Sequence, residues 1–95
     1  MGEKFAIVRR ESGITDVMVE FLKFSLWTVD TSHPTSNDYE KCKAIKDKFD
    51  VHYGQYWGCY IGSGNFNYFQ NQYIVFTYKF NGTVEREFKL LRQWG

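Results

Sequence analysis

The residues that could do chemistry are few and poorly arranged for an enzyme. The two histidines, His33 and His52, are not spaced with cysteines or carboxylates in a metal-binding pattern. Ser63 stands between two glycines but lacks the Gly-x-Ser-x-Gly sequence of a nucleophile elbow. Glu85 and Glu87 would share one face of a strand, as glycosidase carboxylates can, but a solvent-facing edge explains them better. We therefore expect no enzyme, no metal site and no cofactor.

Composition narrows the class of protein further. The 95 residues are expected to form one domain, 1–95, and the net charge of +1 gives no attraction to nucleic acid or to an anionic membrane. No apolar run reaches the roughly 18 residues of a membrane span. Aromatic residues make up 20% of the chain, too many for a core of this size to hide. Some of these rings are therefore expected to line a groove or an interface.

The two cysteines do not form a recognisable framework. Cys42 and Cys59 are separated in the chain and match no metal-ligand or redox spacing. We interpret both as reduced, buried thiols of a cytosolic protein and not as a disulfide.

The first third of the chain predicts a short strand and then a helix. Phe5 to Val8 form an apolar run between charged flanks. Thr15 is a plausible N-cap, followed by a helix from Asp16 to about Thr31 with apolar residues around most of its circumference. Such a helix either packs between the sheet and a second helix or carries an additional partner surface.

A second helix should follow the loop that contains Pro34. Asn37 precedes Glu40 by three residues, which resembles a capping arrangement, and Gly54 is expected to end the helix. Cys42, Ile45 and Phe49 share its inward face. Four lysines are expected to point mostly outward as a solvated face: Lys41, Lys43, Lys46 and Lys48.

The rest of the chain, from Tyr56 to Leu91, predicts four short strands. Aromatic and β-branched runs are separated by Gly and Asn, and Asn81-Gly82 is a strong hairpin signal. Two helices followed by a run of strands indicate an α+β fold: a short N-terminal strand and two helices packed on an antiparallel sheet.

The short run Phe66–Gln70, flanked by glycines and Asn71, would leave main-chain groups exposed at its edge. Either another copy of the chain or a guest peptide could pair there. Stacking of nucleic-acid bases on the rings is a weaker interpretation, because Lys79 is the only cation near them.

Three motifs in order carry a resemblance to a known family. Residues 45–53 read Ile-x-x-x-Phe-Asp-x-x-Tyr, residues 57–62 read Trp-x-Cys-x-Ile-Gly, and residues 76–82 read Phe-x-Tyr-x-Phe-x-Gly. Together they resemble the small peptide-binding dynein light chains, the class distinct from the Tctex and roadblock types. The resemblance covers nearly the whole chain, although its first third matches only in pattern.

The resemblance implies a strand-swapped dimer in which the 66–70 segment crosses to the partner's sheet. Extended peptides would add a strand beside it. The residues implied at this groove and dimer edge are Phe66, Asn67, Tyr68, Phe69, Gln70, Phe76, Tyr78, Phe80 and Asp38. Of these, Phe76, Tyr78 and Phe80 would form the groove floor, and Asp38 would help to read a glutamine in the ligand.

The chain also departs from the family pattern. Gly58 replaces a histidine at the dimer interface, so a pH switch there would be missing. Phe66 occupies a position that is usually glycine in the family, and Tyr39 one that is usually lysine. Glu85 and Glu87 fall where small or apolar residues usually line the groove, and they would favour a basic ligand or a single dedicated partner.

The function implied is that of a non-catalytic dynein motor light chain. Its expected partners are dynein intermediate chains and a second copy or another light chain, with no nucleic acid and no membrane. The departures favour an axonemal or ciliary dynein over the cytoplasmic motor, which places the chain in the cytoplasm and cytoskeleton. The alternatives are a general dimerisation hub for non-motor partners and a small aromatic-sheet domain that binds RNA or serves as an enzyme subunit.

Overall fold

Two helices and four strands make up the computed structural model, which describes residues 4–62 and 71–93. In chain order the elements are β1 (Phe5–Arg10), α1 (Asp16–Ser32), α2 (Asp38–Tyr53), β2 (Trp57–Ile61), β3 (Tyr73–Tyr78) and β4 (Arg86–Arg92). This order confirms the predicted α+β class. The predicted strand at 66–70 lies outside the described residues.

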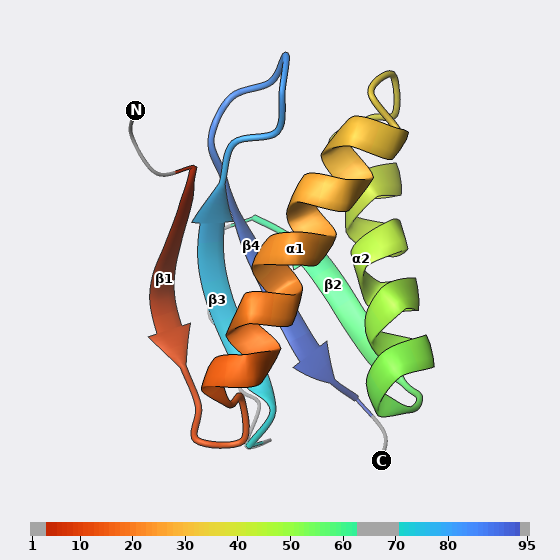
Figure 1. Cartoon of the computed structure of the whole chain (residues 1–95). Coiled ribbons are helices and arrows are strands. Elements are labelled where there is room, and N and C mark those ends of the chain that lie inside the picture. Colours follow the sequence, from red (N-terminus) through yellow and green to blue (C-terminus); the bar gives the residue numbers. More distant parts are fainter. Residues whose placement is uncertain (1–3, 63–70, 94–95) are drawn as a thin grey trace.

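The four strands form one antiparallel sheet in the order β1-β3-β4-β2. Figure 1 shows α1 and α2 side by side over one face of this sheet, with β1 and β2 as its outermost strands. The first strand of the chain therefore pairs with β3, far away in sequence, and the two helices form a layer of their own. In the described part of the chain, both β1 and β2 are edge strands.

Local sequence sets the start of each helix and the end of α2. The Thr15 hydroxyl accepts a hydrogen bond from the Met18 N–H at 3.2 Å, and the Asn37 side chain accepts one from the Glu40 N–H at 2.8 Å. Both predicted N-caps are thus confirmed. Gly54 follows α2 at a φ of 87°, a conformation that a residue with a side chain rarely adopts.

The cap at the start of α2 can be tested directly. Asn37→Ala should lower the free energy of unfolding by about 1 kcal/mol, because one helix N–H loses its acceptor. Urea unfolding measures the change, and Ser36→Ala is the matched control, since no side-chain hydrogen bond of Ser36 is present in the described residues and its backbone bond to His33 is unaffected. Equal losses in the two variants would contradict the capping role.

The core fills the space between the helices and the sheet. Apolar side chains of α1, α2, β2, β3 and β4 meet there, and Phe5 of β1 packs against them. The fully buried ones include Leu22, Ile45, Phe49, Trp57, Ile74, Phe76, Phe80, Phe88 and Leu90. The period of two along β3 places Ile74, Phe76 and Tyr78 on this side of the sheet. Val75 lies on the opposite face with Tyr73 and Leu91.

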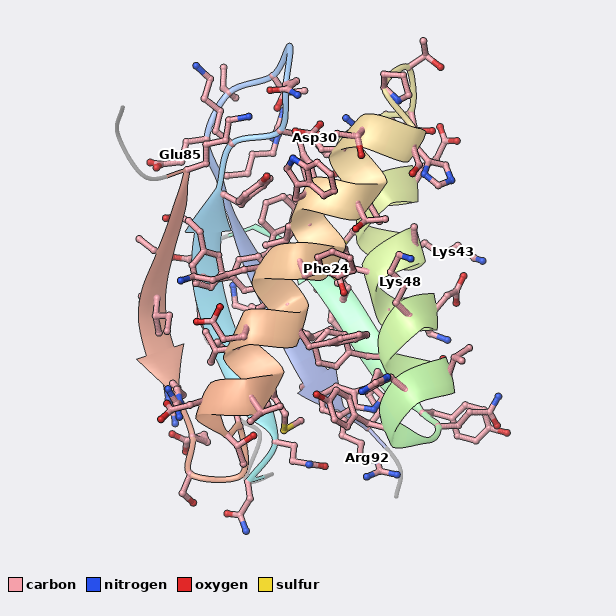
Figure 2. The ribbon with its side chains drawn as sticks, in the orientation of Figure 1. Phe24, Asp30, Lys43, Lys48, Glu85 and Arg92 are labelled. Atoms are coloured by element: carbon pink, nitrogen blue, oxygen red, sulfur yellow. A yellow bond between two sulfur atoms is a disulfide. The ribbon has the colours of Figure 1, made fainter. Side chains whose placement is uncertain are left out.

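One lysine of α2 contradicts the prediction of a solvated lysine face. Lys41 is 1% exposed, and its Nζ lies 3.1 Å from the Asp30 carboxylate, which is itself 3% exposed. Asp30 also accepts hydrogen bonds from the Asn81 N–H at 3.1 Å, and Lys41 sits over the Phe80 ring. Figure 2 shows Asp30 at the end of α1 close to the connection between β3 and β4. The pair therefore joins both helices to that connection.

The prediction of two free thiols was also wrong. Cys42 and Cys59 form a disulfide that links α2 to β2, with 5.5 Å between their Cα atoms. Their sequence separation of 17 residues hides this proximity, because it arises only when the inward face of α2 packs over β2. The link holds the edge strand against the helix layer.

The turn at Asn81-Gly82 differs in detail from the predicted tight hairpin. The Thr83 N–H donates to the Phe80 carbonyl at 3.1 Å, and only Gly82 has a positive φ, of 77°. The turn lies inside a longer connection, 79–85, between β3 and β4. None of the helices described is long and apolar enough to cross a membrane.

Candidate functional site

The free side of β2 is the main candidate for recognition. The Gly62 N–H donates to the Glu87 carbonyl at 2.9 Å and the Gln93 N–H to the Tyr56 carbonyl at 2.7 Å. Because antiparallel pairing alternates, the main-chain groups of Gly58 and Tyr60 also face β4. The main-chain groups of the alternate residues, Trp57, Cys59 and Ile61, face the other way. They point toward an edge that no described strand occupies.

Three residues of β2 direct their main-chain groups to this open edge. The Trp57 N–H donates to the Asp50 carboxylate at 2.6 Å, so the start of the edge is tied to α2. Cys59 and Ile61 have no main-chain partner on this side within the described residues. Their N–H and C=O groups form a short edge that could accept an added strand.

A hollow of about 230 Å³ lies between α2 and β2 beside the open edge. Its lining residues are Tyr39, Lys43, Lys46, Trp57, Gly58, Cys59, Tyr60 and Gln93. The hydrogen bond from Lys46 to Asp50, at 2.5 Å, raises the pKa of Lys46 against the opposing effect of desolvation. This bond keeps the Lys46 ammonium group beside the Asp50 carboxylate at the rim of the hollow.

A side chain at position 58 would crowd two neighbouring side chains. A Cβ there would lie 2.8 Å from the Tyr60 ring and 2.9 Å from the Gln93 side chain. Gln93 Nε2 donates to the Tyr60 hydroxyl, which holds both side chains over this position. A histidine, which the family resemblance places here, would need both to move.

Asp38 lies in a second hollow, of about 390 Å³, between the start of α2 and the β3–β4 connection. The lining residues are Asn37, Asp38, Tyr39, Gly82, Thr83, Val84 and Arg86. Arg86 Nε pairs with Asp38 Oδ2 at 2.6 Å, whereas Oδ1 is buried and has no hydrogen-bond partner in the described residues. A buried carboxylate oxygen without a donor is costly, so an N–H group that reached Oδ1 would be favoured there.

The other predicted site residues fall into two groups. Phe76, Tyr78 and Phe80 are buried in the core on the side of the helices. Burial, with a contribution from the Asp30 carboxylate, raises the pKa of the Tyr78 hydroxyl. Buried rings can still support a bound ligand from below, so their assignment to the groove floor stays a prediction. The segment Phe66–Gln70 lies outside the described residues.

Two features of this region escaped sequence reasoning. The pairing of Arg86 with Asp38 joins residues far apart in the chain, and only their opposite charges could have indicated it. The open side of β2 was also missed, since the edge was predicted at 66–70. The small residue Gly58 inside an otherwise bulky strand was the one available sign of close packing there.

No cluster of three histidine, cysteine or carboxylate residues in the part of the chain that is described could hold a metal ion. His52 stacks on the Phe21 ring, and Glu87 lies 3.4 Å from the Lys89 ammonium. Glu85 is exposed near the end of the β3–β4 connection (Figure 2).

Comparison with known proteins identifies the fold. No family model and no curated protein matches the sequence. Among solved structures, the chain matches the dynein light chain-like domain of the Fasciola hepatica calcium binding protein FhCaBP2, determined as a mercury derivative. The TM-score is 0.69 at 12% identity, over 100% of this chain and 97% of that one. The chain therefore has the dynein light chain-like fold, with a sequence far from this neighbour's.

Proposed function

We propose that this chain, which has the dynein light chain-like fold, is a non-catalytic adaptor that dimerises and binds extended peptide segments by strand addition. The observation that carries the proposal is the open side of β2. Main-chain groups of Cys59 and Ile61 face it without a partner in the described residues. A strand that pairs there gains hydrogen bonds independent of its sequence.

A second copy of the chain is the proposed first occupant of this edge. Its segment Phe66–Gln70 would pair with β2, as the family resemblance implies, and a guest peptide would then add beside that segment. The Trp57–Asp50 hydrogen bond supports this role, because it holds the start of β2 in place before a partner arrives. A pre-organised edge loses less entropy on binding.

Selectivity for the guest is assigned to the hollow around Asp38. Its free Oδ1 would accept a hydrogen bond from a side-chain N–H group of the peptide, while Arg86 holds the other oxygen. The rings of Phe76, Tyr78 and Phe80 would support the guest from below. This arrangement favours a ligand with an amide or cationic side chain.

The partners proposed are dynein intermediate chains, with the protein acting in an axonemal or ciliary motor. Two grooves in one dimer bind two chains, so the second contact is intramolecular and the total affinity far exceeds that of one groove. A general dimerisation hub with non-motor partners is the alternative. Affinity purification from ciliated cells separates them, since recovery of intermediate chains supports the motor and their absence beside other clients supports the hub.

The strand-addition edge can be tested with a single substitution. Ile61→Pro removes the N–H that faces the open edge but no bond to β4, and proline is tolerated at such edge positions. We expect the variant to stay folded and to sediment as a monomer where the parent is a dimer, with a loss of at least about tenfold in dimer affinity, or roughly 1.4 kcal/mol.

Ile61→Ala is the matched control, because it removes a similar apolar contact and keeps the N–H. It should dimerise close to the level of the parent. If the parent itself is a monomer at high concentration, or if Ile61→Pro dimerises as well as Ile61→Ala, strand addition at β2 is wrong.

A further inference from the structure

The outer face of the helix layer exposes large apolar side chains. Phe24 and Trp27 on α1 are 62% and 60% exposed, and their ring centroids are 6.3 Å apart. Val17 extends the same row toward the start of the helix, and Val51 on α2 is exposed as well. Soluble proteins rarely leave several large apolar side chains together in water unless a partner covers them.

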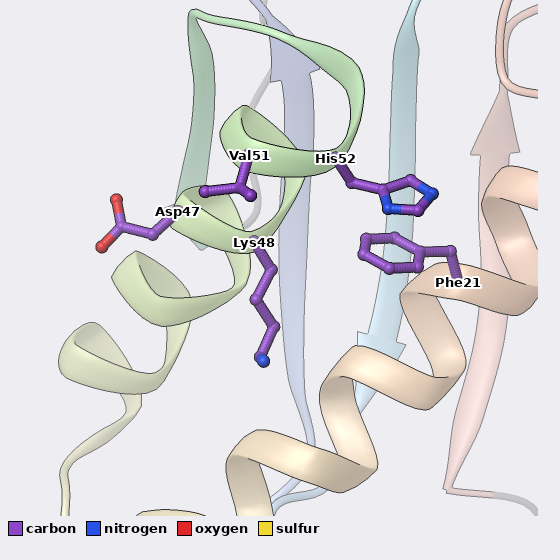
Figure 3. Close-up of a pocket in the computed structure, with 5 residues that line it drawn as sticks. All are labelled: Phe21, Asp47, Lys48, Val51 and His52. Carbon is purple, nitrogen blue, oxygen red and sulfur yellow. The ribbon is translucent and has the colours of Figure 1, made fainter.

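A hollow of about 390 Å³ between α1 and α2 continues this row. Its lining residues are Phe21, Asp47, Lys48, Val51 and His52. Figure 3 shows the His52 ring stacked on Phe21, with Lys48 reaching from α2 into the space between the helices and Asp47 pointing away. The stacked rings have centroids 4.2 Å apart and give the hollow an apolar, pre-formed wall.

Of the two oppositely charged side chains that line this hollow, Asp47 is paired and Lys48 is not. Asp47 pairs with Lys43 at 3.2 Å and with Lys46 at 3.6 Å. Lys48 forms no ion pair within the described residues, although its neighbours on the helix do. Its ammonium group is therefore an unpaired positive charge at the hollow, and a carboxylate on a partner would complement it.

We propose that this face of the α1–α2 layer binds an acidic amphipathic helix of a partner protein. The apolar row from Val17 through Phe21 and Phe24 to Trp27 spans about 15 Å at 1.5 Å per residue, roughly three helical turns. A partner helix with apolar residues at positions i, i+3, i+4 and i+7 matches that length. A glutamate beside its apolar stripe would lie against Lys48.

A second copy of the chain fits this face less well. A twofold-symmetric contact centred on the hollow would bring two Lys48 ammonium groups together, which repel one another. The outer face of the helix layer points away from the sheet (Figure 1), so this surface and the open side of β2 could be occupied at once. The proposed function does not depend on it.

The test uses a synthetic amphipathic helix of roughly 18 residues with leucines on one face and glutamates beside them. A matched peptide carries lysine in place of every glutamate. NMR titration of the labelled protein should show amide shifts confined to α1 and α2. The acidic peptide should bind at least about tenfold more tightly than the basic one, which corresponds to roughly 1.4 kcal/mol.

Three variants locate the effect. Lys48→Glu should abolish or reverse the preference for the acidic peptide, and Phe24→Ser should weaken both peptides. Both changes are on the surface of the helix layer, so the fold should persist. Lys79→Glu makes the same charge change at an exposed position outside the helices and should leave the preference unchanged.

Three results would overturn the proposal. The first is equal affinity for the acidic and basic peptides, and the second is no binding of either at concentrations up to about 1 mM. The third is self-association that Phe24→Ser abolishes and Ile61→Pro does not, which would make a second copy the occupant. Failure of strand addition at β2, by contrast, would leave these readouts unaffected.

Discussion

Replacing Lys41 with methionine is expected to lower the free energy of unfolding by about 3 to 5 kcal/mol, a large share of the total stability of a small domain. The change keeps most of the side-chain volume but leaves the Asp30 carboxylate buried without its nearest cation. The Asn81 N–H still donates to Asp30, and Lys4 stays 3.7 Å away, so some compensation persists. Urea unfolding at pH 7 measures the loss.

Two further variants show whether the cost arises from an unpaired buried charge. Lys43→Met, on the same helix, breaks an exposed ion pair with Asp47 and should cost about 0.5 kcal/mol or less. The double variant Asp30→Asn/Lys41→Met should lose less than the sum of the two single changes, because neither charge is left alone. If Lys41→Met costs no more than Lys43→Met, the buried pair does not stabilise the fold.

Much of the fold could be predicted because local rules and tertiary packing agree. Thr15 and Asn37 are capping residues placed directly before apolar periodicity, and both cap helices in the structure. Alternation along β3 likewise places Ile74, Phe76 and Tyr78 on one face of the sheet. These features depend on neighbours in the sequence, which are visible without a structure.

The errors have the opposite origin. Lys41 looked like one more lysine of a solvated face, and only the approach of Asp30 from α1 makes it a core residue. Cys42 and Cys59 meet only because α2 packs over β2. The ion pair between Asp38 and Arg86 of β4, which was not predicted, likewise joins two distant parts of the chain. Each arises from contacts between residues distant in sequence, about which periodicity carries no information.

Reduction of the Cys42–Cys59 disulfide is expected to destabilise the protein by about 3 kcal/mol, the value for a closed loop of this length. The cross-link spans 17 residues and restricts the unfolded chain. For a domain of this size, a loss of that magnitude lowers the melting temperature by about 12 to 24 °C. Calorimetry with and without a phosphine reductant measures it.

The double variant Cys42→Ser/Cys59→Ser is the control, because it should melt close to the reduced protein and should not respond to reductant. Identical melting of the parent with and without reductant would show that the link does not form in solution.

The result also bears on location, since reducing compartments keep such cysteines as thiols. In a cytoplasmic or axonemal protein, the reduced form would then be the working form. The position of β2, and with it the edge proposed for dimerisation, would depend on the core around Trp57 and on its N–H bond to Asp50.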